Sequence, residues 1–184
     1  MSAAPLEHHV GPWTEADYLA LGERSDRIEL IDGSLMMTPA AASDHQQCAR
    51  RLANLLEAAA PSTFEIVEAV NVRVAPGRIL IPDVVVTARL GRVVTYEADE
   101  VPLVVEIASP ATILIDRTLK ADLYATAGIE TYLRVELTEP APVLRLYRLE
   151  RGTYVEAASS RQVNRLVLDK PFPVEIAPAR LLHR

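Results

Sequence analysis

The sequence predicts an α/β protein in which a mixed central β-sheet is flanked by helices. Short apolar runs rich in β-branched residues recur between turns that contain Pro or Gly, a pattern typical of strands. Apolar residues at helical spacing predict helices over about 44–60 and 115–127. The 184 residues are 49% hydrophobic, which suits one domain that buries about 70% of its unfolded surface. We therefore predict a single domain over 1–184, with a core at about 13–137 and a C-terminal strand extension at about 143–176.

The first elements are a short helix and a hairpin. Thr14 is placed to cap a helix within 13–22. The runs 27–31 and 34–38 flank Asp32-Gly33, a pair that favours a tight turn because both positions need positive φ. Glu29 alternates with Ile28 and Leu30, so it faces the opposite side of its strand. Taken alone, Glu29 is a solvated strand acid.

The next helix is predicted from Asp44 to Ala60. Ser43 and Gln46 have the spacing of a capping box, and Pro61 ends the helical pattern. Cys48 falls within this helix as a small core residue. It is the single cysteine of the chain, which excludes an internal disulfide and a thiolate metal cluster.

The rest of the chain reads mainly as strands. Segments 64–75 and 79–87, joined at Pro76-Gly77, predict a second hairpin. Pro82 cannot donate to a strand ladder, so a bend or a sheet edge is expected there. A polar loop over 91–100 follows. Later strands are expected at 101–108, 132–137, 143–150, 154–158 and 165–168, and the helix at 115–127 should stop at Gly128.

Two apolar strands each contain one acid, Asp83 and Glu106, and a buried carboxylate is costly unless it is compensated. One interpretation places each acid at an exposed edge or beside an arginine. The other directs both into one cleft, where they hold a hard cation such as Mg²⁺. Lys120 is open in the same way. It is either an exposed ion-pair partner of Asp116, four residues away, or a catalytic lysine above the Glu106 strand.

These residues form an ordered set: Pro82-Asp83, Glu106-x-x-Ser-Pro-x-Thr, and Asp116-Arg-x-x-Lys120-x-x-x-Tyr124. The set resembles the Uma-type family of restriction-endonuclease-like proteins, within the PD-(D/E)xK nuclease superfamily. In that superfamily the lysine usually lies two residues after the second acid, a position that is Ala108 here. The Uma-type variant moves the lysine to the following helix, as in this chain. The resemblance covers about 28–135 and departs at 131–136, where the tryptophan of the family pattern is missing.

The resemblance implies a restriction-endonuclease-like core and a Mg²⁺-dependent endonuclease that hydrolyses DNA, with Mn²⁺ as a substitute metal. Asp83 and Glu106 would bind the metal, and Glu29 would assist them. Lys120 would orient the attacking water or stabilise charge in the transition state. Four further residues are implied to contact substrate or to support the site: His45, Gln46, Asp116 and Tyr124.

Two other functions stay open. One is a non-catalytic module of the same fold that binds nucleic acid or a protein, and the other is a hydrolase of another phosphate ester. The net charge of −6 argues against indiscriminate coating of nucleic acid, although it allows a local basic groove. Five arginines either form a basic strip that binds phosphates or are solvated charges on strands and turns: Arg145, Arg148, Arg151, Arg161 and Arg165.

The sequence also indicates where the protein acts. It contains no apolar run of about 20 residues and no signal-peptide pattern, so we expect a cytoplasmic protein without membrane contact. Its histidines show no spacing for zinc. A homodimer is the expected assembly of a nuclease that cuts both strands, because most soluble oligomers are twofold symmetric.

Overall fold

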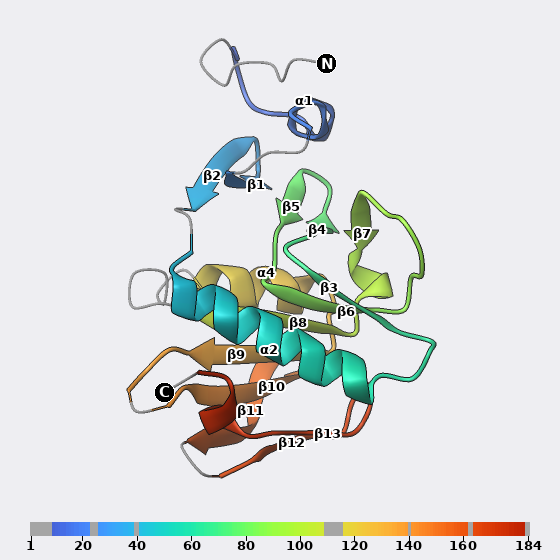
Figure 1. Cartoon of the computed structure of the whole chain (residues 1–184). Coiled ribbons are helices and arrows are strands. Elements are labelled where there is room, and N and C mark those ends of the chain that lie inside the picture. Colours follow the sequence, from blue (N-terminus) through green and yellow to red (C-terminus); the bar gives the residue numbers. More distant parts are fainter. Residues whose placement is uncertain are drawn as a thin grey trace.

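Two mixed β-sheets form the framework of the structure (Figure 1). The computed structural model describes residues 9–22, 26–38, 41–108, 116–139, 141–161 and 164–182, except for the side chains of Asp116 and Arg117. In the larger sheet β8 and β9 run parallel, and the other neighbouring pairs are antiparallel. Its strands, in spatial order, are β11 (Thr153–Arg161), β10 (Val143–Glu150), β9 (Thr131–Glu136), β8 (Leu103–Ala108), β6 (Val84–Thr87) and β3 (Glu65–Glu68).

The smaller sheet contains the N-terminal hairpin. Only its last pair, β4 with β7, is parallel. Its strands, in spatial order, are β2 (Ser34–Thr38), β1 (Arg27–Ile31), β5 (Arg78–Leu80), β4 (Asn71–Ala75) and β7 (Thr95–Glu97). These results confirm the predicted mixed α/β class, with the strands of the C-terminal extension β10 and β11 joined to the larger sheet.

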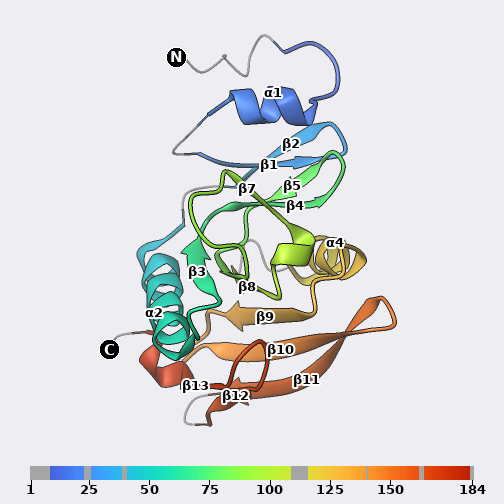
Figure 2. The ribbon, with the colours of Figure 1, turned by 90° about the vertical axis from the view of Figure 1, so that its right-hand side faces the viewer.

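Helices cover both faces of the larger sheet (Figure 2). Helix α2 (Ser43–Ala59) packs on the face that includes Val105, whereas α4 (Ala121–Thr126) packs on the face that includes Val104. Successive strand residues point to opposite faces, so Glu106 points to the same face as Val104. The alternating direction of the side chains in β8 thus places the Glu106 carboxylate beneath α4.

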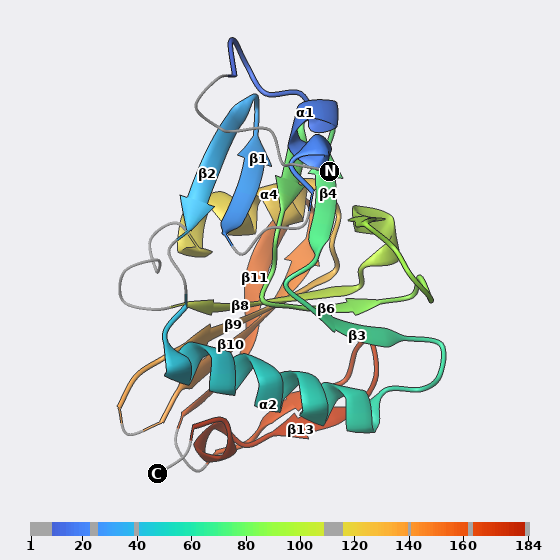
Figure 3. The same ribbon diagram turned by 45° about the horizontal axis from the view of Figure 1, so that its top comes forward.

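Smaller elements close the two ends of the molecule. Helix α1 (Glu15–Ala20) packs on the smaller sheet, and Thr14 caps it as predicted. The short sheet of β12 (Leu166–Leu168) and β13 (Val174–Ile176) lies against α2 (Figure 3). The chain also forms two 3-10 turns, η2 (Ala98–Glu100) and η4 (Pro178–Arg180). None of the helices described is long and apolar enough to cross a membrane.

The predicted hairpin is confirmed. Strands β1 and β2 pair across Asp32 and Gly33, whose φ angles are 48° and 81°. Cys48 is buried in the core, also as predicted.

The capping-box prediction for α2 is wrong. Ala42 is the N-cap and makes no side-chain cap, while Ser43 is the first helical residue. From that position the Ser43 hydroxyl donates to Asp44 Oδ1 at 3.2 Å. The helix itself is present because its apolar residues are buried against the larger sheet.

The predicted second hairpin is partly wrong. Each of its long strands is divided: Ala69, at φ 51°, separates β3 from β4, and Pro82-Asp83 separates β5 from β6. The two predicted strands do pair: β4 with β5 in the smaller sheet, and β3 with β6, also antiparallel, in the larger sheet. Asp83 therefore lies where the chain crosses from one sheet to the other.

The segment predicted as one helix over 115–127 begins differently. Described residues start with a π-helical turn, η3 (Asp116–Lys120), which leads into α4. Such turns occur often at functional sites because they re-aim side chains. The polar loop predicted over 91–100 contains β7 and η2, and β13 was not predicted. A strand of only three residues is too short for its alternating pattern to be recognised in the sequence.

Candidate active site

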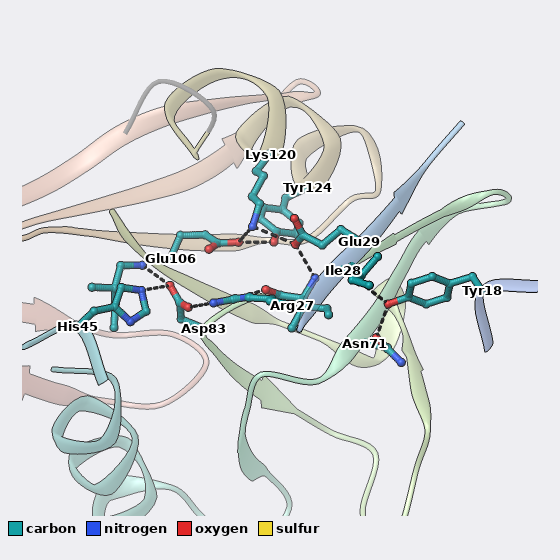
Figure 4. A network of polar contacts seen from close by, with 12 residues as sticks. Tyr18, Arg27, Ile28, Glu29, His45, Asn71, Asp83, Glu106, Lys120 and Tyr124 are labelled. Carbon is teal, nitrogen blue, oxygen red and sulfur yellow. Dashed lines mark hydrogen bonds and ion pairs between the residues drawn. The ribbon is translucent and has the colours of Figure 1, made fainter. Parts of the chain in front are cut away.

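Glu106 lies in the middle of the larger sheet and is 2% exposed. Its Oε1 atom accepts a hydrogen bond from the Tyr124 hydroxyl at 2.6 Å and one from Lys120 Nζ at 3.2 Å (Figure 4). Tyr124 belongs to α4 and Lys120 ends η3, so the segment above the sheet supplies both donors.

Glu29 reaches the same lysine from the smaller sheet. Its side chain is fully buried, and its Oε1 lies 2.9 Å from Lys120 Nζ. The backbone N–H of Ile81 also donates to Oε1, at 2.7 Å. Lys120 therefore bridges Oε1 of Glu29 and Oε1 of Glu106, two carboxylates from different sheets. Within the described part of the chain, Glu29 Oε2 is buried and has no hydrogen-bond partner.

Asp83 lies beside Glu106, just before β6 begins. Its backbone N–H donates to the carbonyl oxygen of Val105 at 3.1 Å. Its Oδ2 accepts the backbone N–H of Ile107 at 2.6 Å and lies 3.3 Å from His45 Nε2. Figure 4 shows these contacts converging on one carboxylate.

Arg27 is the second cation of the cluster. Its guanidinium pairs with Asp83 Oδ1 and also donates to the carbonyl oxygen of Ile81. Arg27 and Glu29 are two residues apart on β1, so both project from the same face of that strand. Sequence reasoning missed Arg27, because the spacing shows only that it shares a strand face with Glu29, and its acid partner is 56 residues away in the chain.

The environment of Asp83 keeps it ionised. Burial raises the pKa of this carboxyl, but the hydrogen bond from His45 and the positive charge of Arg27 outweigh burial and hold the pKa well below its usual range. Tyr124 behaves in the opposite way. Burial and the nearby charges of Glu106 and Glu29 raise the pKa of Tyr124 well above its usual value, so its hydroxyl stays a donor.

The cluster as a whole combines three carboxylates with two fixed cations. Among the residues described, no three His, Cys, Asp or Glu side chains group closely enough to hold one ion. The donor set nevertheless suits a hard divalent cation, because its oxygens are carboxylates and Glu29 Oε2 is a buried, unsatisfied acceptor. A cation that binds here competes with Arg27 and Lys120 for the acids.

The structure brings together most residues that the sequence singled out: Glu29, His45, Asp83, Glu106, Lys120 and Tyr124. Lys120 is only 6% exposed, so it is not a surface ion-pair residue. Gln46 is exposed on α2, and the side chain of Asp116 lies outside the described residues. Asp83 does pair with an arginine, as the simpler interpretation of a strand acid anticipated.

Three of the five arginines singled out in the C-terminal strands are engaged in ion pairs. Arg145 contacts Glu156, Arg148 contacts Asp169, and Arg165 contacts Glu175. These pairs favour the interpretation of solvated, neutralised charges over that of a phosphate-binding strip.

A mixed sheet flanked by helices, with buried acids and a lysine on the turn that leads into α4, defines a restriction-endonuclease-like nuclease fold. A family model described as "Putative restriction endonuclease", Uma2, matches residues 15–181. The chain belongs to this Uma2 family, which confirms the resemblance seen in the sequence.

A solved structure agrees in fold. The crystal structure of "a putative nuclease belonging to DUF820" from Anabaena variabilis superposes with a TM-score of 0.76. The alignment covers 92% of this chain and 97% of that one, at 15% sequence identity. A comparison with curated proteins finds no match.

Proposed function

We propose that the protein is a Mg²⁺-dependent endonuclease that hydrolyses DNA phosphodiester bonds. The observation that carries the proposal is the position of Lys120 between Glu29 and Glu106, with Asp83 hydrogen-bonded to the two residues that flank Glu106. Burying a lysine among acids costs free energy. Charged groups buried at such a cost are found most often at functional sites. The description of the family as restriction endonucleases supports the same reaction class.

Asp83, Glu106 and Glu29 would hold the metal through carboxylate oxygens. A bound Mg²⁺, or Mn²⁺ in its place, would polarise a phosphoryl oxygen and lower the pKa of a water molecule for in-line attack. The protein supports these oxygens with fixed donors. Tyr124 orients Glu106, and the Ile107 N–H together with His45 orients Asp83.

Lys120 is the residue proposed to act on the reacting atoms. Its ammonium group is a positive charge with three hydrogen-bond donors, suited to a phosphoryl oxygen or an attacking water. A positive charge held in a buried site stabilises developing negative charge strongly, because little solvent screens it.

Nicking of supercoiled plasmid DNA tests this proposal. We expect the wild-type protein to convert supercoiled DNA to open circles in Mg²⁺ or Mn²⁺, and EDTA to stop the reaction. Lys120→Ala should abolish nicking, whereas Lys170→Ala, at the chain's other lysine, should leave it unchanged. Nicking by Lys120→Ala at the wild-type rate would contradict the proposed role.

One observation favours a second candidate, the non-catalytic module. Arg27 and Lys120 already pair with the acids, so two of the three carboxylate charges are compensated without a metal. Binding of DNA by the wild type without cleavage in Mg²⁺ and Mn²⁺ would favour that candidate. The homodimer also stays a prediction, which analytical ultracentrifugation tests.

A further inference from the structure

Apart from the candidate active site, a pocket of about 170 Å³ opens between α4 and the hairpin of β10 and β11. Figure 2 shows α4 above this part of the larger sheet. We propose that the pocket binds one unpaired nucleobase of the nucleic acid, an inference that rests on the proposed nuclease function. Its lining includes three tyrosines, one arginine and one acid: Tyr132, Tyr147, Tyr154, Arg134 and Asp122.

The three tyrosine rings pack against one another. The Tyr132 ring centroid lies 5.6 Å from that of Tyr147 and 5.4 Å from that of Tyr154. Tyr132 is buried, while Tyr147 and Tyr154 are half-buried and so remain partly accessible. The Tyr154 hydroxyl donates to the carbonyl oxygen of Ile129 at 2.8 Å, which fixes its ring. Rigid aromatic rings are the usual platforms on which unpaired bases stack.

The charges in the pocket select a neutral planar ligand. The Arg134 guanidinium carbon lies 5.1 Å from the Tyr147 ring centroid, and its side chain is held by Glu136 at 3.0 Å. A resident cation over this ring disfavours a second one, so a quaternary ammonium ligand is a poor match. Arg134 donors and the Asp122 carboxylate offer the complementary groups that the edge of a base requires.

The size of the pocket fits one base. Its volume of about 170 Å³ is below the roughly 300 Å³ at which pockets for drug-sized ligands begin. It therefore admits a single purine or pyrimidine ring rather than a whole nucleotide, and the sugar and phosphate would lie outside.

The pocket adjoins the candidate active site. Arg134 on β9 is the register partner of Glu106 on β8, and neighbouring strands lie about 4.8 Å apart. Asp122 follows Lys120 by two residues, and the Tyr124 ring centroid lies 6.0 Å from that of Tyr132. A nucleotide with its base in this pocket would thus place its own phosphate close to the carboxylates.

This position has a consequence for the substrate. A base inside a duplex must leave its stack before it can enter the pocket, and this unstacking costs free energy. The enzyme should therefore prefer single-stranded DNA, or sites where a base is already unpaired, over intact duplex.

Binding of labelled oligonucleotides in EDTA tests the inference without any turnover. The probe is a single-stranded oligonucleotide of roughly 12 nucleotides, read by fluorescence anisotropy beside the matching duplex. Tyr147→Leu keeps the apolar bulk but removes the ring, and Tyr147→Phe keeps the ring. We expect Tyr147→Leu to weaken single-strand binding by about 5- to 150-fold, as expected for the loss of one stack, and Tyr147→Phe to bind like the wild type.

The outcomes separate this inference from the proposed function. Equal binding by wild type and Tyr147→Leu, or no binding of the single strand by the wild type, would overturn the pocket. Cleavage by the wild type that does not depend on Tyr147 would leave a nuclease without this base site. Binding that depends on the Tyr147 ring, in a protein that never cleaves, would keep the pocket and reject the nuclease.

Discussion

At the scale of single residues, Lys120 has two roles that one substitution separates. It pairs with both Glu29 and Glu106, and we propose that it also stabilises the transition state. Lys120→Ala should leave Mn²⁺ affinity unchanged or raise it, because a competing positive charge is removed. Turnover should fall by roughly 10²- to 10³-fold, the scale of losing one transition-state donor. Calorimetric Mn²⁺ titration beside a cleavage assay gives both readouts, and weakened Mn²⁺ binding would contradict the competition.

Arg27 should compete with a metal ion for Asp83. It pairs with Asp83 Oδ1 and is only 21% exposed, so the carboxylate is occupied in the absence of metal. Arg27→Gln should raise Mn²⁺ affinity and lower the stability of the metal-free protein by about 2 kcal/mol, the scale of a hydrogen bond to a charged group. Arg78→Gln, which disrupts the exposed pair with Asp32, is the matched control. Unchanged Mn²⁺ affinity in Arg27→Gln would show that the arginine does not compete.

The ionisation of Asp83 should make the unfolding free energy depend on pH. Its pKa is lowered in the folded protein, whereas an unfolded aspartate titrates near 3.9. A lowered folded pKa gives stability that is present above the unfolded value and is lost as the pH falls toward the folded one. The difference in unfolding free energy between wild type and Asp83→Asn should therefore shrink below about pH 4. Urea denaturation from pH 3 to pH 7 measures it, and a difference that grows below about pH 4 would contradict this sign.

The residues of the site were predictable to different degrees. Asp83, Glu106 and Lys120 stand out because each is a polar exception in an otherwise apolar or helical pattern. Arg27 does not stand out, because an arginine at the start of a strand is ordinary until another sheet brings an acid against it. Its partner Asp83 is 56 residues away in the chain, a pairing that only the fold creates.

At the scale of elements, the β1–β2 hairpin positions Glu29, and Gly33 makes its turn possible. A Cβ at this position would lie 2.8 Å from Pro12 Cβ, and the φ of +81° is itself unfavourable for other residues. Gly33→Ala should lower the unfolding free energy by about 1 to 3 kcal/mol. Gly152→Ala is the control, since φ is +84° there but the added Cβ meets nothing within 4 Å. Thermal melts should show the larger loss of stability in Gly33→Ala. Equal losses in both variants would show that the clash with Pro12 does not contribute.

Elements were predictable where the pattern is local. Helix α2 follows from its apolar spacing, and the first hairpin follows from Asp32-Gly33. The break beside Asp83 was expected from Pro82, but the division at Ala69 was not, because apolar alternation is the same whether a strand joins one sheet or passes between two. The sheet that a strand joins depends on contacts distant in sequence, which no local pattern contains.

At the scale of the whole molecule, the two sheets meet at the cluster, since β1 supplies Glu29 and β8 supplies Glu106. A metal that joins these carboxylates would link both sheets and should stabilise the entire protein. Mn²⁺ at about 100 times its dissociation constant should add about 2.7 kcal/mol to the unfolding free energy. Differential scanning fluorimetry with Mn²⁺ checks this, and Glu29→Gln should reduce the effect. An equal gain in Glu29→Gln would indicate metal binding elsewhere.

The most direct test of the central claim compares DNA cleavage by Asp83→Asn and Asp99→Asn in Mn²⁺. Both changes remove one carboxylate charge, but Asp83 lies within the cluster and Asp99 is exposed in η2. We predict that Asp83→Asn loses Mn²⁺ binding and turnover, because a hard cation requires the anionic oxygen that an amide lacks. Asp99→Asn should cleave like the wild type. Cleavage by Asp83→Asn at the wild-type rate would contradict the assignment of this cluster as the active site.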